Sequence, residues 1–285
     1  MNSRRLVPLA LLLLAGGIAL AQRGGRRWGG ERYNEDLRTA REVESGSTGT
    51  PVWEYPEAFK TDVFTFARIR YERGGWGRGG GWTTDLPDSD LNLSWRLQQM
   101  TSLKVDPDAR IIRPTDPELA DYPFIYIVEP GGLFFSDDEV MAMRKYLENG
   151  GFLLLDDFWG EDEWENCEEV IKKVLPNRSF AEIPLTHPLY RSVFTIKEKA
   201  QVPSIRIGIE SEFGGPTTER YDDADVVHHR GIFDDKGRPM VIALHNTDNG
   251  DGWEREGESA FYFKQFSERT AYPLAINIIF YVMTH

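Results

Sequence analysis

The sequence predicts an α/β fold with a mostly parallel central sheet, and a strand–helix–strand unit near its middle supports that prediction. Residues 123–128 and 152–155 are short apolar runs of the kind that a strand covered on both faces requires. The amphipathic helix between them begins at a capping box, Ser136 with Glu139, and ends at Asn-Gly-Gly in residues 149–151. Two strands joined by a helix at this spacing pair in parallel with a right-handed crossover.

The elements before this unit are shorter. Residues 62–71 alternate between an aliphatic face and a face that passes from phenylalanine to arginine, which predicts a strand that leaves the core at its end. Residues 111–112 form a brief second strand. Asp88 or Ser89 is expected to cap a helix over residues 90–100.

A glycine-rich tract follows the first of these strands. Gly75, Gly77 and Gly80 match the G-x-G-x-x-G pattern of dinucleotide-binding loops. That pattern requires a helix directly after the third glycine, whereas the polar stretch TTDLPDSD follows here. We therefore predict a rim loop that presents Trp76 and Trp82.

The elements after the unit complete the fold. Residues 161–175 form a helix in which Cys167 lies on a buried apolar stripe, which favours a structural role for this thiol over a catalytic one. Residues 226–233 and 239–244 flank a turn and predict a β-hairpin towards the C-terminus. A buried helix is predicted over residues 272–284, with proline in its first turn.

The N-terminus predicts export. Residues 1–21 have a basic start, an apolar run and small residues before a cleavage point, as in a secretory signal peptide. The run is interrupted by Pro8 and is too short for a membrane span, so we expect a protein that is not integral to the membrane after cleavage. Residues 22–60 have the composition of a flexible Arg/Gly-rich linker, and residues 61–285 form one domain. The expected location is periplasmic or extracellular.

The net charge and the cysteine content argue against several classes of partner and site. The formal net charge of -13 argues against nucleic acid as a partner, because phosphates require a basic surface. Cations, neutral polymers or a basic partner protein fit this charge better, and the expected partner is a cell-envelope protein or a glycan. The single cysteine excludes an intramolecular disulfide and a metal site built on paired cysteines.

Polar residues follow the predicted strands at the edge where α/β sheets bind ligands. They are Glu72, Glu129, Asp156, Asp157, His245, Asp248 and Asp251. Asp156 and Asp157 can cap the next helix, hold a hard cation or act as acid and base. Asp248 and Asp251 lie in a segment with the composition of a calcium loop, although it lacks the spacing of an EF-hand, so a divalent-cation site and a turn of Asx type are both open. No other cofactor is predicted.

Several segments resemble the bacterial family called domain of unknown function 4159. The resemblance runs from about Asp62 to the C-terminus and rests on FTFARIRY, DLPDSDLNL, YPFIYI, SDDEVMAMRKYLENGGFLLLDDFWG, HPLYRSVF and HNTDNGDGW. This family looks like an offshoot of the class I glutamine amidotransferase-like superfamily, which implies a flavodoxin-like three-layer sandwich. Its glutaminase members carry a catalytic cysteine at the turn after the second strand. Here Asp156 or Asp157 stands at that turn and His245 stands where the histidine is expected, so a Cys-His amidotransferase is excluded.

Two functions remain. The first is an exported, non-catalytic binding or scaffold module, which the missing nucleophile favours. In this interpretation Glu129, Trp159, Trp76 and Trp82 contribute to ligand binding. The second is a hydrolase in which the carboxylates of Asp156 and Asp157, with His245, activate water directly or through a cation. The sequence leaves open whether the protein is an enzyme.

Overall fold

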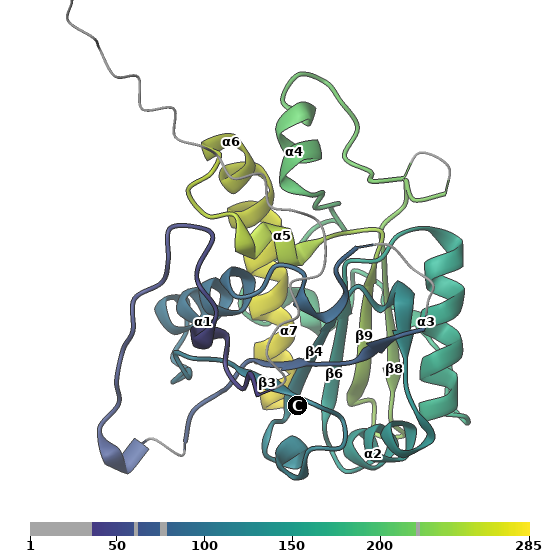
Figure 1. Cartoon of the computed structure of the whole chain (residues 1–285). Coiled ribbons are helices and arrows are strands. Elements are labelled where there is room, and N and C mark those ends of the chain that lie inside the picture. The colour runs from purple at the N-terminus through teal and green to yellow at the C-terminus, as the bar shows by residue number, and fades with distance from the viewer. Residues whose placement is uncertain (1–35, 60–61, 75–78, 221–222) are drawn as a thin grey trace, which may run out of the picture. The chain divides into compact units, whose positions relative to one another are not determined.

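The computed structural model describes residues 36–59, 62–74, 79–220 and 223–285 (Figure 1). The predicted signal peptide, the first part of the predicted linker and Trp76 lie outside the described residues.

A seven-stranded sheet of order β3-β1-β4-β6-β9-β8-β7 forms the centre of the fold (Figure 1). The strands are β1 (Ala67–Ile69), β3 (Arg110–Ile112), β4 (Phe124–Val128), β6 (Phe152–Asp156), β7 (Ala181–Glu182), β8 (His228–Phe233) and β9 (Pro239–His245). The five strands from β3 to β9 run parallel, β8 runs antiparallel to β9, and β7 at the edge runs antiparallel to β8. A separate antiparallel pair consists of β2 (Glu72–Arg73) and β5 (Leu133–Phe134).

Helices cover both faces of the sheet. One face packs against α1 (Asp88–Met100), α5 (Asn249–Glu254) and α7 (Tyr272–Thr284), and the other against α2 (Asp137–Glu148) and α3 (Gly160–Val174). The short α4 (Ile205–Ser211) and α6 (Ala260–Tyr262) lie beyond the strand ends, and a π-helical segment, Phe263–Ala271, joins α6 to α7. Short 3-10 turns are Ala40–Glu42, Glu57–Phe59, Gly81–Thr83, Pro117–Asp121, Pro130–Gly132 and Pro188–Arg191.

The central prediction, a mixed α/β fold with a mostly parallel sheet, is confirmed. β4 and β6 are parallel neighbours joined by α2, and the capping box of Ser136 and Glu139 forms at the start of that helix. β8 and β9 form the expected hairpin, which is part of the central sheet. The C-terminal helix has the predicted bounds, 272–284.

Three local expectations differ from the structure. Arg68 does not lead the first strand out of the core: its side chain is fully buried and pairs with Asp90 of α1. Neither Asp88 nor Ser89 caps α1, because Pro87 is the N-cap and the Asp88 carboxylate instead accepts hydrogen bonds from Ser45 and Gly46. Residues 249–254, expected to be part of a turn-rich loop, form α5.

Part of the segment predicted as a linker packs on the domain. Leu37 and Ala40 are buried in the core next to α1. The indole Nε1 of Trp53 donates to the carbonyl of Val105 at 2.7 Å, and its ring lies 5.1 Å from that of Trp95. The contacts are made by the few apolar residues of this segment. The prediction of a linker gave more weight to its Gly- and Ser-rich composition than to these residues.

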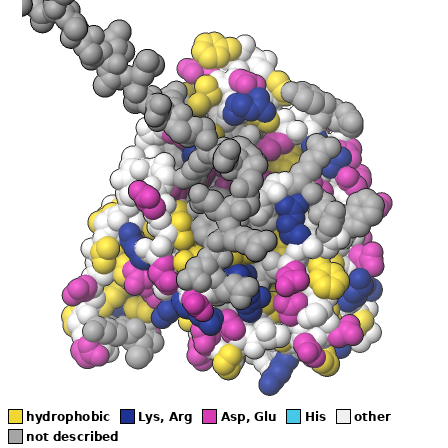
Figure 2. Space-filling model, viewed as in Figure 1, with side chains coloured by type: hydrophobic (Ala, Val, Ile, Leu, Met, Phe, Trp, Pro, Cys, Tyr) yellow, Lys and Arg dark blue, Asp and Glu magenta, His cyan; other side chains and the backbone are white. Residues whose placement is uncertain are grey.

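The described surface mixes charges of both signs. On the face in Figure 2, lysine and arginine side chains are interspersed with aspartate and glutamate. Within the described part of the chain, the helices are all too short or too polar to cross a membrane.

Candidate functional site

Strained backbone gathers where three neighbouring parallel strands end. Glu129 follows β4 with φ 50°, Asp157 follows β6 with φ 58°, and Asn246 follows β9 with φ 61°. Asp85, in the loop before α1, has φ 63°. Side chains other than glycine rarely adopt this left-handed region, at a cost of roughly 1–3 kcal/mol each, and such residues cluster at functional sites.

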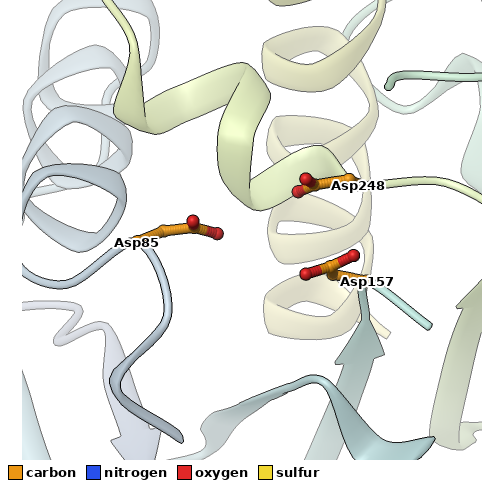
Figure 3. A group of neighbouring side chains, drawn as sticks. All are labelled: Asp85, Asp157 and Asp248. Carbon is orange, nitrogen blue, oxygen red and sulfur yellow. The ribbon is translucent and has the colours of Figure 1, made fainter. Parts of the chain in front are cut away.

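Three carboxylates meet at this edge of the sheet, from segments far apart in the sequence. Asp85, Asp157 and Asp248 each place an oxygen within 4.8 Å of the others, and Figure 3 shows the three side chains pointing toward one another. Asp157 is 9% exposed and Asp248 is 4% exposed. The Oδ2 atom of Asp85 is buried and has no hydrogen-bond partner among the described residues. We refer to these three residues as the aspartate cluster.

Arg68 fixes the loop that carries Asp85. Its guanidinium donates to the carbonyls of Trp82 and Thr84, at 3.0 and 2.9 Å, and forms a buried ion pair with Asp90. The loop on the N-terminal side of Asp85 and the helix on its C-terminal side are thus tied to one side chain of β1. Gly250 leaves room for the carboxylate, because a Cβ there would lie 2.2 Å from Asp85 Oδ2.

The other two members are held by their local turns. The indole Nε1 of Trp159 donates to Asp157 Oδ1 at 2.9 Å, which orients this carboxylate after the strand end. Asp248 is the N-cap of α5, and its Oδ1 accepts from the backbone N–H of Asp251 at 2.7 Å. One oxygen of each carboxylate is therefore used to fix its position.

A second group of carboxylates also includes Asp85, but this group lies next to an arginine side chain. Asp85, Asp251 and Glu254 also place oxygens within 4.8 Å of one another. Arg255 Nε lies 2.5 Å from Glu254 Oε2 and 3.9 Å from Asp251 Oδ1. Within the described part of the chain, neither Asp157 nor Asp248 has an arginine or lysine at ion-pair distance. Arg68 and Arg255 act on Asp85 from a greater distance, so the least compensated negative charge in the aspartate cluster is at Asp157 and Asp248.

The pKa values of the clustered carboxylates are raised, as expected for acidic groups that are buried close together. Burial, and then the neighbouring carboxylates, raises the pKa of Asp85, Asp157 and Asp248 well above the ordinary value. Burial also raises the pKa of Glu129 to about 7. An added cation would favour the ionised form of each of these groups.

Asp156 has a structural role beside the cluster. It points to the face covered by α5, where its carboxylate accepts from Asn249 Nδ2 at 2.8 Å, Gly250 N at 3.0 Å and the Tyr126 hydroxyl at 3.3 Å. Burial raises its pKa to about 7 despite these bonds. Of the two adjacent acids, Asp157 is therefore the one available to a ligand.

The glycine-rich loop wraps around Glu129. The backbone N–H groups of Gly80 and Gly81 donate to its two carboxylate oxygens, at 3.2 and 2.5 Å. A Cβ on Gly79, whose φ is 88°, would lie 1.8 Å from Glu129 Oε1, so only glycine fits there. These backbone donors, which a dinucleotide site would direct at phosphate, are used inside the protein.

His245 is oriented away from Asp156. The alternation of side chains along β6 and β9 places Asp156 towards α5 and His245 towards α3. The imidazole Nε2 donates to the carbonyl of Gly160 at 2.9 Å, and Nδ1 contacts Arg230 Nη1 at 3.1 Å. Its ring packs against Phe158 and Trp164, and burial lowers its pKa to about 4.

The predicted tryptophans have separate positions. Trp159 is buried and holds Asp157, as described above. Trp82 is partly buried, and the Arg70 guanidinium lies 5.0 Å from the centre of its ring. Cys167 is fully buried in α3, and burial raises the pKa of its thiol, in agreement with the structural role predicted for it.

Sequence reasoning pairs Asp248 with Asp251, whereas the structure brings Asp248 together with Asp157 and adds Asp85. Asp85 is not predicted, because it lies in a loop between a glycine-rich tract and a helix, far from the strand ends in sequence. The signal that points to it is the acidic start of the DLPDSDLNL segment. A group that offers only carboxylate oxygens is suited to a hard cation such as Ca²⁺ or Mg²⁺.

Comparison with known proteins identifies one matching protein family. The family model described as "Domain of unknown function (DUF4159)" matches residues 65–283. No curated protein matches the chain. The matched range contains every residue of the aspartate cluster.

Proposed function

The chain belongs to the family of domain of unknown function DUF4159, and on the geometry of its aspartate cluster we propose that it is an exported binding module that holds a divalent cation. Asp85, Asp157 and Asp248 supply the protein ligands. The observation that supports this most strongly is that Asp85, whose buried Oδ2 has no hydrogen-bond partner among the described residues, points with its side chain toward two further buried carboxylates (Figure 3).

The buried negative charge of the aspartate cluster requires a compensating positive charge. Carboxylates at this distance repel one another strongly when they are buried, and native proteins pair buried charges or place a metal between them. The neighbouring group contains Arg255, but the aspartate cluster has no such side chain within the described residues. A divalent cation supplies the missing charge and a ligand for the unpaired oxygen.

Export fits this chemistry. A signal peptide over residues 1–21 would deliver the domain to the periplasm or beyond it. Extracellular modules bind Ca²⁺ with dissociation constants of about 10⁻⁴–10⁻³ M, a range that three carboxylates can reach. The net charge of -13 raises the local cation concentration further. In this setting a cell-envelope protein or a glycan can complete the coordination of the cation.

The position of Asp157 supports a finer fold assignment. We propose that the domain is an offshoot of the class I glutamine amidotransferase-like superfamily with a flavodoxin-like arrangement. Asp157 has a strained backbone at the strand-to-helix turn after β6, where the glutaminases of that superfamily carry cysteine. The nucleophile is thus replaced by a residue type that binds cations.

The same strained position favours a second candidate function, metal-assisted hydrolysis. A cation at Asp157 would acidify a bound water and turn it into a nucleophile. His245 contributes nothing to this version, because both of its ring nitrogens already have partners. Ester hydrolysis that requires the cation and is lost in Asp157→Asn would favour the enzyme over the binding module.

Titration calorimetry tests the cation site. Chelator-stripped protein is titrated with Ca²⁺ and with Mg²⁺, and compared with Asp157→Asn, Asp248→Asn and the control Asp121→Asn, which removes an exposed carboxylate. We expect one bound cation per chain, with affinity reduced at least about tenfold in the first two variants and unchanged in the control. Equal affinity in all four proteins would exclude the site.

A further inference from the structure

A cavity of about 310 Å³ lies away from the aspartate cluster, against β8 and the start of α7. Its walls come from residues 194–198 and Ala200, from His229 of β8, and from residues 269–270 and 273–274. Its volume is at the lower end of the range of small-molecule sites. None of its lining residues belongs to the aspartate cluster.

His229 provides a buried polar group in the wall. The residue is 2% exposed, and its Nδ1 lies 3.0 Å from the hydroxyl oxygen of Tyr190. The ring of Tyr190 stacks on the imidazole, with the two ring centroids 5.8 Å apart. Its Nε2 is buried and has no hydrogen-bond partner among the described residues. Burial lowers the pKa of His229 to about 3, so the ring is neutral and offers one donor and one acceptor.

The rest of the lining is mostly apolar, with Thr195 and Thr270 as its uncharged polar residues, and charged side chains also line the cavity. Phe194, Ile196 and Leu274 supply the apolar lining. Lys197 and Arg269 lie with Glu198 at the same cavity, and Arg269 Nη2 is 3.7 Å from Glu198 Oε1 with both side chains mostly exposed. These three side chains leave one net positive charge on a protein whose formal charge is -13.

We propose that this cavity binds a small organic acid with an apolar body and a hydroxyl group at its far end. The carboxylate would lie between Lys197 and Arg269, and the apolar body against Phe194, Ile196 and Leu274. The hydroxyl would bond to His229 Nε2 after a small local shift of the ring, because Nε2 has almost no accessible surface. A hydroxyl suits this position because it can donate or accept, and therefore satisfies either tautomer of the imidazole.

The proposal is independent of the cation site. It uses different residues, and the aspartate cluster contributes none of its contacts. Loss of cation binding in Asp157→Asn would therefore leave the cavity unaffected, and a failure of the cavity would leave the cation site intact.

The test uses 4-hydroxyphenylacetate as the probe and two matched analogues. Phenylacetate lacks the hydroxyl, and 4-hydroxyphenylacetamide lacks the negative charge. Binding is followed by calorimetry and by the imidazole resonances of His229 in NMR spectra. We expect the probe to shift those resonances, and each analogue to bind at least about tenfold more weakly, because each loses one charged or polar contact.

Variants locate the site. His229→Phe keeps a ring but removes both nitrogens, and should weaken the probe about tenfold, whereas His187→Asn, a histidine outside the cavity, should not. Because His229→Phe leaves the Tyr190 hydroxyl unpaired, the surface variant with Lys197→Gln and Arg269→Gln serves if the first does not fold. Absence of saturable binding by the probe, or binding unchanged in both variants, would overturn the proposal.

Discussion

At the scale of single residues, Asp157 combines three unfavourable features. Its backbone is left-handed, its side chain is nearly buried, and its charge faces Asp85 and Asp248. Asparagine would tolerate the same backbone and could still accept from Trp159, but without the repulsion. A residue that costs stability at such a position is typical of sites that are needed for function.

This balance predicts a stabilising variant. In the presence of chelator, Asp157→Asn should raise the free energy of unfolding by about 1 kcal/mol, because it removes one of three repelling charges. Denaturant unfolding of both proteins measures this. The control Asp121→Asn should stay within about 0.5 kcal/mol of the wild type. A loss of stability in Asp157→Asn without any cation would show that the carboxylate is held by attractive contacts instead.

At the scale of elements, the local signals were sufficient for the scaffold. The capping box before α2, the apolar runs of β4 and β6 and the turn between β8 and β9 each depend on residues close in sequence. Such patterns report directly on neighbouring backbone geometry. The parallel sheet and the edge that carries the acids could therefore be predicted.

The parts that could not be predicted depend on distant partners. From the sequence, Arg68 is expected near the end of a strand that leaves the core. Its buried position is explained only by its ion pair with Asp90 of α1. The helix α5 has six residues, too few for a periodic apolar pattern. Asp85 joins the site because Arg68 holds its loop, a relation between residues that no local pattern contains.

At the scale of the whole molecule, acidic groups with raised pKa values make stability depend on pH. The pKa of Glu129 is about 7 in the folded protein against an ordinary value of 4.5, so between these values the folded state binds more protons than the unfolded state. Stability is then highest below about pH 4.5 for this group and falls as the pH rises to about 7. Asp85, Asp157 and Asp248 shift in the same direction.

We therefore expect the unfolding temperature in chelator to fall between pH 5 and pH 8, and added Ca²⁺ or Mg²⁺ to restore it most at pH 8, because the cation requires ionised ligands. Thermal unfolding at fixed ionic strength measures both effects, with Na⁺ added at equal ionic strength as the control. A protein that becomes more stable from pH 5 to pH 8 in chelator would contradict the charge balance described here.

On the geometry of the cluster, Asp85, Asp157 and Asp248 are proposed to hold one divalent cation. Anomalous diffraction from crystals of chelator-stripped protein soaked in Mn²⁺, whose oxygen ligands resemble those of Mg²⁺, tests it most directly. We expect a peak among the three side chains, within about 2.6 Å of an oxygen of each. A map with no peak there, or with Mn²⁺ bound only by other residues, would contradict it.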